Sequence, residues 1–271
     1  MTDIIGIDAG GTRMKAAYME DGKISTKVFP IDELEKAAAW LSMLKPQASF
    51  AVTGGRAKQL ESILGSKMEV VSEFHASCKG IKHLLLEEKI TIDSFIFVVV
   101  GTGTSIHLIQ KDSHERLAGS GLGGGTIAGL GSLLTGQTSY SRLGQMAKSG
   151  DRKKVDLLVR DIYSMGESPL PDELTAANFG KAGEGSNHDD SAAALTTMVA
   201  ETIILLVTMA AEKHGTQHIV FAGGAMDGNP LLAETLEQYK NMLGYVPYFP
   251  ARGMYSGAIG AMLIGGRNVE V

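Results

Sequence analysis

Short apolar runs alternate along this chain with longer stretches of helical spacing. Short runs rich in valine, isoleucine and phenylalanine predict buried strands, whereas apolar positions at helical spacing predict helices. The predicted strands are Asp3–Ile7, Phe50–Val52, Phe95–Val100, His218–Ala222 and Val246–Phe249. The predicted helices are Ile31–Leu44, Ala76–Leu86, Leu143–Lys148 with Val155–Tyr163, Ala192–Lys213 and Leu231–Leu243. Strands that alternate with helices predict an α/β protein.

Two of the strands run into a glycine-rich bend that is followed at once by a second apolar strand. The segment "IIGIDAGGTRMKAAYM" covers Ile4–Met19, and "VVVGTGTSIHLI" covers Val98–Ile109. Polar residues interleaved after each bend predict a β-hairpin, where a simple nucleotide-binding unit would place a helix. We interpret the chain as an internal duplication with its junction near Ile92–Ser94, which predicts two lobes, 1–93 and 94–271.

The chemistry of the two bends suits phosphate. A glycine-rich hairpin bend leaves backbone N–H groups unpaired and lets another molecule approach the chain closely. Thr12, Thr102 and Thr104 add hydroxyl donors, and Lys15 adds a cation. Asp8 ends the first strand, where its carboxylate would repel phosphate unless Mg²⁺ lay between them, directly or through water. One such bend is usually only a turn, but two of them predict a nucleotide clamped between two lobes.

Two further glycine clusters extend this prediction. The segment "GSGLGGGTIAGLGSLL", Gly119–Leu134, passes from a glycine loop into a helix whose N-terminus attracts anions. The segment "IVFAGGAM", Ile219–Met226, ends a strand in two glycines, where flat backbone can lie against an adenine ring. Close helix packing remains an alternative for the first cluster, and a strand-to-helix turn remains one for the second.

Phosphoryl transfer also needs groups that take up a proton and neutralise charge. Glu73 in "VVSEFHAS" follows an apolar run and precedes a helix. It is either a general base or an ordinary acidic residue at a helix N-terminus. Arg116 in "HERLAGSG" follows the second hairpin. It stabilises the transferred phosphate or holds a substrate oxygen, or it is a solvated side chain.

Composition argues against several other classes. The 271 residues carry a formal net charge of −5 with no basic stripe, and their aromatic residues are few, so no nucleic-acid surface is expected. A single cysteine fits a reducing compartment and no signal peptide is visible, so we expect a cytoplasmic protein. The most apolar later stretch, Thr202–Ala211, is about half the length that spans a bilayer, so no membrane partner is expected.

Other catalytic motifs are missing from the sequence. The seven histidines show neither HExxH nor a zinc-type spacing with cysteine. There is no GxSxG nucleophile motif and no GxxxxGKS phosphate loop. Because "GTGTSI" is not followed by a helix pattern, a dinucleotide fold is not expected either.

Taken together, the motifs resemble those of the type II pantothenate kinases. They are "GIDAGGTRMK", "TGG" at 53–55, "SEFHA", "VGTGTSIH", "GLGGGTIAGLGSLL", "LTAANFGK" at 174–181 and "SGAIGA" at 256–261. They occur in the family's order over essentially the whole chain. "DAGGT" is shared with many members of the actin and hexokinase superfamily, whereas "GTGTS", the glycine loop and "LTAANFG" together are specific.

The resemblance implies the duplicated actin-like (ribonuclease H-like) α/β ATPase fold, with nucleotide in the cleft between two lobes. It implies ATP- and Mg²⁺-dependent phosphorylation of pantothenate to 4′-phosphopantothenate, the first step of coenzyme A biosynthesis. Glu73 matches the family's catalytic base, and Ser105 and Arg116 match residues expected at pantothenate and the transferred phosphate. The residues that match the family's ATP site are Asp8, Ala9, Gly10, Gly11, Thr12, Arg13, Met14, Lys15, Thr102, Gly124, Gly125, Thr126, Ile127, Ala128, Tyr140 and Gly224. At Gly224 some relatives have a side-chain hydroxyl, so only backbone contact is expected there.

The resemblance also implies a homodimer, with the helix that carries Tyr239 and the Ala192–Lys213 helix at the interface. Two other function classes stay open. One is another small-molecule kinase, such as an N-acetylhexosamine kinase, or an activator ATPase of the same superfamily. The other is a nucleotide-binding protein without catalysis. Sugar kinases of this fold usually use an aspartate base, whereas this chain offers Glu73 before a helix.

Overall fold

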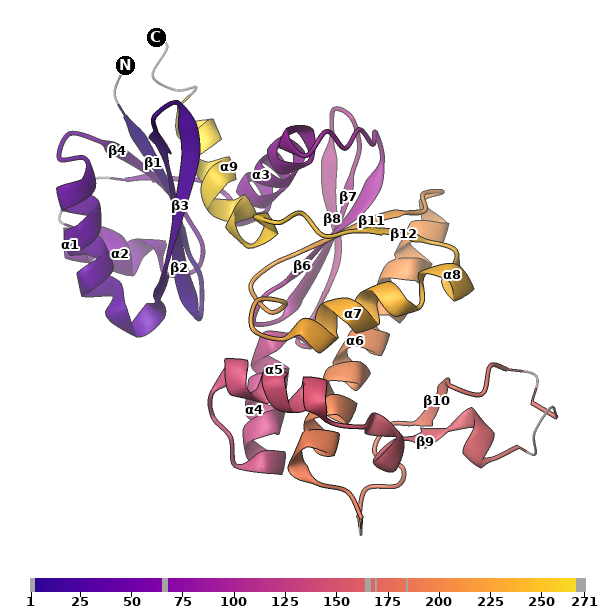
Figure 1. Ribbon diagram of the computed structural model, residues 1–271. Helices are drawn as coiled ribbons and strands as arrows, with labels where there is room; N and C mark the ends of the chain where they lie inside the picture. The colour runs from indigo at the N-terminus through magenta and orange to yellow at the C-terminus, as the bar shows by residue number, and fades with distance from the viewer. Residues whose placement is uncertain (1–2, 65–67, 164–166, 169, 184, 267–271) are drawn as a thin grey trace.

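The computed structural model describes residues 3–64, 68–163, 167–168, 170–183 and 185–266. These residues form two five-stranded sheets with helices on their faces (Figure 1) and a small two-stranded sheet of Leu157–Leu158 and Thr175–Ala177 (β9 and β10). The elements built from the first part of the chain are β1 (Ile4–Ala9), β2 (Arg13–Glu20), β3 (Lys23–Pro30), α1 (Leu34–Leu44), β4 (Ser49–Thr53), α2 (Ala57–Leu64), β5 (Glu69–Val70) and α3 (Glu73–Glu87). Those that follow are β6 (Phe95–Val100), β7 (Thr104–Ile109), β8 (His114–Ser120), α4 (Gly124–Thr135), α5 (Tyr140–Ser149), β9 (Leu157–Leu158), β10 (Thr175–Ala177), α6 (His188–Lys213), β11 (His218–Ala222), α7 (Pro230–Gln238), α8 (Lys240–Leu243), β12 (Val246–Tyr248) and α9 (Ser256–Gly265).

The two five-stranded sheets share one topology. The first has the order β3-β2-β1-β4-β5, and the second has the order β8-β7-β6-β11-β12. In each, three consecutive strands pair antiparallel and the next two add in parallel. The two hairpins predicted from the glycine-rich bends, β1–β2 and β6–β7, are therefore confirmed, and each is the start of one copy of the repeated unit.

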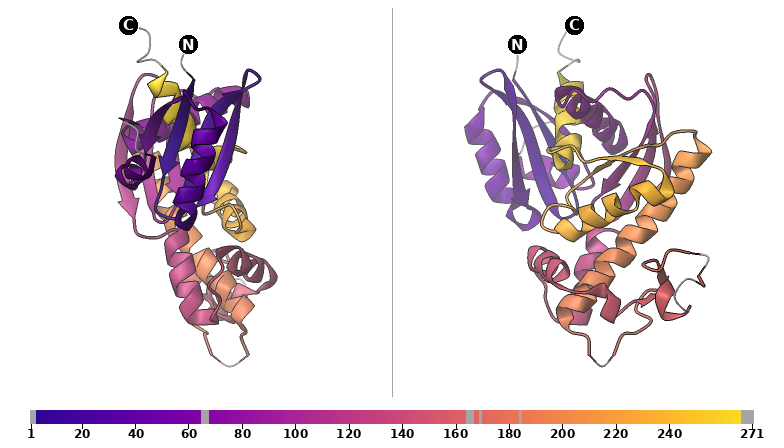
Figure 2. Two further views of the ribbon diagram at one scale, coloured as in Figure 1. Left: turned by 90° about the vertical axis from the view of Figure 1, so that its left-hand side faces the viewer. Right: turned by 45° about the vertical axis from the view of Figure 1, so that its right-hand side comes forward.

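Helices α3 and α9 lie between the two sheets (Figure 2). Helix α9 packs against β1, β2 and β4 of the first sheet, although it comes from the end of the chain. Side chains of α3 meet Phe95 and Phe97 of the second sheet in the same core cluster. We keep the division of the chain at residues 93 and 94 as a proposal, with α9 as the segment that returns to the first sheet.

Glycines let α3 and α9 cross at backbone contact. A Cβ on Gly260 would lie 1.7 Å from the carbonyl oxygen of Ala76, and a Cβ on Gly80 would lie 1.9 Å from that of Ser256. Both values are far below any real Cβ contact, so the crossing requires glycine at each position. Because both sheets pack on this helix pair, the crossing sets the distance between the two halves of the molecule.

Two of the predicted helices are wrong in part. Residues Val155–Tyr163, predicted as helix, contain β9 and a short 3-10 turn, because the buried carboxylate of Asp156 accepts a hydrogen bond from the Phe179 amide at 2.9 Å and ties the segment to a distant loop. The predicted helix Leu231–Leu243 is divided into α7 and α8 at Tyr239, whose hydroxyl donates to the Glu201 carboxylate on α6. Tertiary hydrogen bonds outweigh the local pattern at both places.

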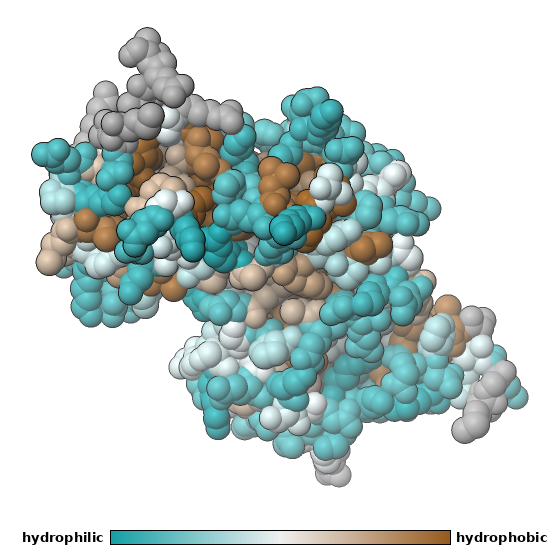
Figure 3. Space-filling model, turned by 45° about the horizontal axis from the view of Figure 1, so that its top comes forward, coloured by the Kyte–Doolittle hydropathy of each residue, from teal (hydrophilic) through white to brown (hydrophobic). Residues whose placement is uncertain are grey.

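Helix α6 is, among the described residues, the one helix long and apolar enough to cross a membrane. Of its most apolar window, 61% is buried inside the protein, where it packs against α4, α5 and α7. It also underlies β6 and β11 in the core of the second half. Burial of this kind is that of a core helix. On the face shown in Figure 3, hydrophilic residues predominate and hydrophobic ones form separate patches.

Candidate active site

A cleft of about 550 Å³ opens where the two hairpins meet. Its walls come from both halves of the duplication and include the start of α3 and the segment that leads into α9. The predicted site residues that line it are Asp8, Gly10, Gly11, Thr12, Arg13, Lys15, Glu73, Thr102, Ser105, Arg116, Gly124, Gly125, Ala128, Tyr140 and Gly224. One cavity thus gathers residues that lie far apart in the sequence.

The first glycine turn (Gly10–Thr12) and the second glycine turn (Gly101–Gly103) face each other directly. The hydroxyls of Thr12 and Thr102 share a hydrogen bond of 3.1 Å, although ninety positions separate them. Beside this contact, Arg13 forms an ion pair with Asp227, which follows β11. A ligand between the halves would therefore be in reach of both turns at once.

Asp8 and Lys15 line the cleft on the side of the first sheet. They are directly paired across β1 and β2, and the Lys15 Nζ donates to Asp8 Oδ2 at 3.0 Å. Both side chains are largely enclosed, with 13% of Lys15 and 16% of Asp8 exposed. The N-terminal turn of α9 lies against the carboxylate, because a Cβ on Gly257 would be only 3.2 Å from Asp8 Cγ. The pair presents one cation and one carboxylate to whatever fills the cleft.

Glu73 is the first residue of α3 and lines the same cleft. Its carboxylate forms no hydrogen bond or ion pair with any residue that the structure describes. Partial desolvation and, second, the nearby negative charge of Asp8 raise the pKa of Glu73 above its ordinary value, while Lys15 acts in the opposite sense. A free carboxylate with a raised pKa can accept a proton from a substrate hydroxyl.

Ser105 and Arg116 form the opposite wall, on β7 and β8. Arg116 Nε donates to Ser105 Oγ at 3.3 Å. The guanidinium group of Arg116 lies over the ring of Phe74, with 5.1 Å from Cζ to the ring centroid. This stacking fixes the position of the cation on its wall of the cleft, and Glu73, the residue before Phe74, lines the same cleft.

The first residues of α4 support the second glycine turn. The Gly124 amide donates to the Gly101 carbonyl and the Gly125 amide donates to the Thr102 carbonyl, each at 2.8 Å. These two N–H groups are therefore already paired and hold the turn in place. A Cβ on Gly125 would lie 2.9 Å from the Thr102 oxygen, so close packing explains the glycine here. Both glycines still line the cleft.

The far end of the cleft is built from Tyr140 and the bend after β11. The Tyr140 hydroxyl donates to the Ala225 carbonyl at 2.5 Å. Burial raises the pKa of Tyr140 to about 12, so the hydroxyl keeps its proton. Gly224 has open space where a side chain would stand, which leaves a flat stretch of backbone facing the cleft.

Four predicted ATP-site residues do not line the cleft. Ala9, Met14 and Ile127 are buried in the two hydrophobic cores, at 0%, 0% and 1% exposure. The Thr126 hydroxyl donates to the Gly121 carbonyl at 2.8 Å and so stabilises the loop. Along β1, β2 and the start of α4, the buried side chains point away from the face whose residues line the cleft.

Several lining residues were not predicted as part of the site. They are Phe74, Ser77, Val99, Ser120, Ala225, Met254, Ser256 and Gly257. Some adjoin predicted residues and follow from the same turns. Met254, Ser256 and Gly257 come from the last part of the sequence, where the "SGAIGA" motif pointed to Ser256 and Gly257 and nothing pointed to Met254. Gly101, Gly103, Thr104 and Gly223 also line the cleft, and they belong to the glycine-rich segments from which the site was predicted. The Thr104 hydroxyl, predicted as a donor to phosphate, donates instead to the Leu122 carbonyl at 2.8 Å.

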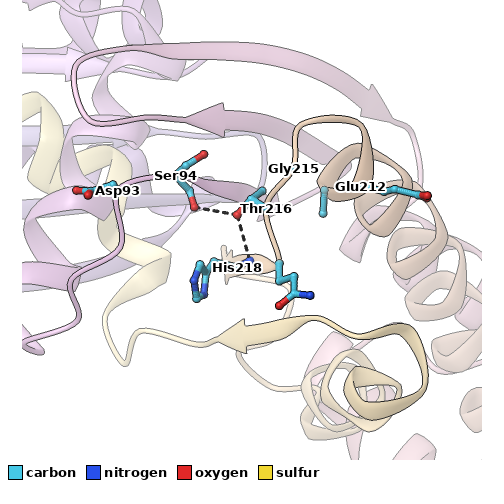
Figure 4. A pocket seen from close by; sticks show the side chains of 8 residues that line it. Asp93, Ser94, Glu212, Gly215, Thr216 and His218 are labelled. Carbon is cyan, nitrogen blue, oxygen red and sulfur yellow. Dashed lines mark hydrogen bonds between the residues drawn. The ribbon is translucent and has the colours of Figure 1, made fainter.

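A second hollow, of about 620 Å³, lies at the other ends of β6 and β11 (Figure 4). Asp93, Ser94, Glu212, Thr216 and His218 line it, and none of the predicted site residues does. The Thr216 hydroxyl donates to the Ser94 carbonyl at 2.9 Å and accepts from the His218 amide at 3.3 Å. These bonds join backbone to backbone across the start of two strands, which is a structural role.

Comparison with known protein families gives a match over most of the chain. The profile of the Fumble family matches residues 13–264. The type II pantothenate kinase of Oceanobacillus iheyensis is 43% identical over 262 residues, which cover 96% of this chain and 98% of that protein. Those of Bacillus cereus and Staphylococcus haemolyticus are each 38% identical, over 97% and 96% of this chain and 98% and 99% of theirs.

Solved structures share the fold at low identity. Component A of the (R)-2-hydroxyglutaryl-CoA dehydratase of Acidaminococcus fermentans superposes with a TM-score of 0.65 at 16% identity, covering 97% of each chain. A ROK family glucokinase from Streptomyces griseus superposes with a TM-score of 0.60 at 14% identity, covering 97% of this chain and 98% of its own. These likenesses confirm the predicted actin-like ATPase fold and, at this identity, nothing about substrate.

Proposed function

Because this chain belongs to the Fumble family and to its type II pantothenate kinases, we propose that it phosphorylates pantothenate with ATP. The product is 4′-phosphopantothenate, the first intermediate on the way to coenzyme A. The observation that carries the proposal is the cleft in which both glycine turns, an unpaired carboxylate and a stacked arginine converge. Relatives named for this activity cover nearly the whole chain, which supports the same activity for the full length of the fold.

We assign the phosphates of ATP to the space beside the two glycine turns. Lys15 and Arg13 supply positive charge there, and the hydroxyls of Thr12 and Thr102 can exchange their mutual hydrogen bond for bonds to phosphate oxygens. The adenine end lies toward Gly224 and Tyr140, where flat backbone and an aromatic ring offer a stacking surface.

Pantothenate occupies the end of the cleft near Glu73, Ser105 and Arg116. Its primary hydroxyl oxygen bonds to the terminal phosphorus of ATP, the bond from that phosphorus to the bridging oxygen breaks, and ADP leaves. The hydroxyl proton passes to the Glu73 carboxylate, whose raised pKa suits a base that works near neutral pH. Arg116 balances the negative charge that builds up around the transferred group.

Asp8 fits a magnesium ion that arrives with the nucleotide. The described residues contain no group of three or more His, Cys, Asp or Glu side chains that could hold a metal by itself. Mg²⁺ needs no such group, since one or two carboxylates together with phosphate oxygens and water satisfy it. Asp8 supplies the carboxylate in this cleft, and the ion, when bound, would neutralise phosphate charge.

We further propose a cytoplasmic homodimer with α6 at the interface. Leu205, Leu206 and Met209 of α6 are 59%, 36% and 61% exposed, and their helical spacing puts them on one side of the helix. Tyr239 is only 8% exposed, so it offers a partner no side-chain surface. The cytoplasmic location is supported by the cysteine content, since the sequence has a single cysteine, Cys78, whose side chain is buried.

A panel of hydroxyl acceptors tests the substrate. With ATP and Mg²⁺, we expect the purified protein to phosphorylate pantothenate and to leave glucose, N-acetylglucosamine and N-acetylmannosamine unchanged, measured as ADP release in a coupled assay. Equal rates on one of the sugars would favour the hexosamine kinase alternative. ATP binding without transfer to any acceptor would favour a protein that only binds nucleotide.

The variant Arg116→Ala tests whether pantothenate and ATP bind at different ends of the cleft. Because Arg116 contacts Ser105 and Phe74, at the end of the cleft that we assign to pantothenate, its loss should weaken the use of pantothenate more than the affinity for ATP. We expect kcat/KM for pantothenate to fall by about 10-fold or more, as for loss of a charged hydrogen bond, while the Kd of ATP changes little. A larger effect on ATP than on pantothenate would move Arg116 to the nucleotide.

A further inference from the structure

We propose that His107 is a positioning residue for the substrate: its imidazole fixes the Ser105 hydroxyl so that the hydroxyl hydrogen points into the cleft and donates to an acceptor oxygen of pantothenate. The inference rests on the function proposed above and concerns the same end of the cleft. His107 does not line the cleft and acts only through Ser105.

His107 is a polar side chain that is buried beside two phenylalanine rings. It is 0% exposed, and its ring lies 5.1 Å from that of Phe74 and 6.0 Å from that of Phe97, centroid to centroid. Its Nδ1 has no hydrogen-bond partner among the described residues. A leucine would fill such a site without leaving a nitrogen unpaired, so packing alone does not explain the histidine.

A β-bulge brings His107 and Arg116 to the same face of the sheet. Ser105 pairs with Gly119 and Ile106 pairs with Ala118, but His107 pairs with Arg116, so β8 has one extra residue, Leu117, at this point. Without that residue, Arg116 would point to the opposite face, because side chains alternate along a strand. The bulge therefore places the arginine beside the serine that shares its face with His107.

Ser105 is held from two sides. Its Oγ lies 2.9 Å from His107 Nε2, and it accepts a hydrogen bond from Arg116 Nε at 3.3 Å. A hydroxyl group has two acceptor positions and one donor. If His107 also donates, both acceptor positions of Ser105 are filled from inside the protein and only its hydrogen is left for a ligand.

The protonation of His107 supports this arrangement. Burial, with smaller contributions from the charges of Arg116 and His114, lowers the pKa of His107 to about 4, so the ring is neutral at working pH and carries one N–H. We assign that proton to Nε2, which then has Ser105 Oγ as its acceptor. The opposite tautomer would leave an N–H donor unpaired among aromatic rings, where an orphaned donor is costly.

The consequence is a preference for acceptor groups. Ser105 presents a donor and Arg116 presents a cation, and both line the cleft. A carboxylate or amide oxygen matches this pair, and pantothenate carries both kinds of group. A ligand that offers only a donor at this position would find no acceptor on Ser105.

The test compares four variants in steady-state kinetics with each substrate varied in turn. We expect His107→Leu to raise the KM for pantothenate by about 3- to 10-fold, the factor that one neutral hydrogen bond represents, with the KM for ATP within about twofold of wild type. His107→Gln, whose amide nitrogen can take the place of Nε2, should restore the pantothenate KM. Ser105→Ala should raise it as His107→Leu does, and the double variant should be no worse than Ser105→Ala alone.

The outcomes separate the inference from the proposed function. Because His107→Leu removes an unpaired buried nitrogen, its thermal unfolding midpoint should be no lower than that of wild type. If it does not fold, His107→Asn, too short to reach Ser105, takes its place in the comparison with His107→Gln. Additive effects of the two single variants, or an unchanged pantothenate KM in His107→Leu, would overturn the role of His107 alone. A wild-type protein that does not phosphorylate pantothenate would overturn the proposed function as well.

Discussion

Replacing Glu73 by glutamine is expected to lower the turnover of pantothenate by about 10²- to 10⁴-fold, the usual range for loss of a general base. Glutamine keeps the size and polarity of the side chain but cannot accept the hydroxyl proton. The Kd of ATP should stay near its wild-type value, because the glycine turns and Lys15 are untouched. Turnover within a few-fold of wild type would remove Glu73 from the chemistry.

Glu35→Gln is the matched control for this variant. Glu35 is an exposed acidic residue in the first turn of α1, as Glu73 is in the first turn of α3. If Glu73 served only the helix N-terminus, the two variants would behave alike, with a small loss of stability and normal turnover. We expect normal turnover only for Glu35→Gln.

The raised pKa of Glu73 has a second consequence, for stability. A carboxyl whose pKa is higher in the folded than in the unfolded protein binds its proton more tightly when folded, so its contribution to stability declines as the pH rises through that pKa. At neutral pH the ionised side chain is therefore a cost to the fold. Glu73→Gln should unfold at no lower temperature than wild type, while activity of the wild type should fall as the pH drops through the pKa of Glu73.

Gly260→Ala is expected to destabilise the protein by at least about 3 kcal/mol, at the upper end of overpacking effects. The added methyl group would lie 1.7 Å from the Ala76 carbonyl oxygen and 2.9 Å from the Gly80 amide nitrogen. Both atoms belong to the backbone of a helix, which cannot relieve the clash by a change of rotamer as a flexible side chain can. Helices α3 and α9 would have to separate, and both sheets rest on them.

The matched control is Gly129→Ala on the exposed side of α4. A Cβ there meets nothing within 4 Å, so the alanine should leave stability unchanged or raise it by about 0.5–1 kcal/mol through helix propensity. Urea unfolding followed by circular dichroism measures both variants. A Gly260→Ala protein as stable as wild type would mean that the α3–α9 crossing is looser than described. If the Gly260→Ala protein folds with reduced stability, its activity should also fall, because Gly257 of the same helix packs against the Asp8 carboxylate.

Much of the architecture could be predicted from local pattern. The two hairpins, β6 and β11 follow from apolar runs bounded by glycine, and the duplication follows from the similar shape of the two segments. The third strands β3 and β8 were not predicted, because their exposed edges carry polar residues and lack the apolar signal. Helix α9 was not predicted either, since it is apolar and buried all round and shows no amphipathic period.

The sequence by itself determined the chemical groups of this protein: two glycine turns, a carboxylate ahead of a helix, and an arginine after a hairpin, all written in short segments whose local geometry needs few distant contacts. Only the tertiary structure decided which of these groups meet. The Thr12–Thr102 contact depends on how two helices cross at Gly80 and Gly260, and the place of Arg116 beside Ser105 and His107 depends on one bulged residue in β8. Both arrangements depend on packing between segments that lie far apart in the chain. A local sequence pattern does not predict such packing.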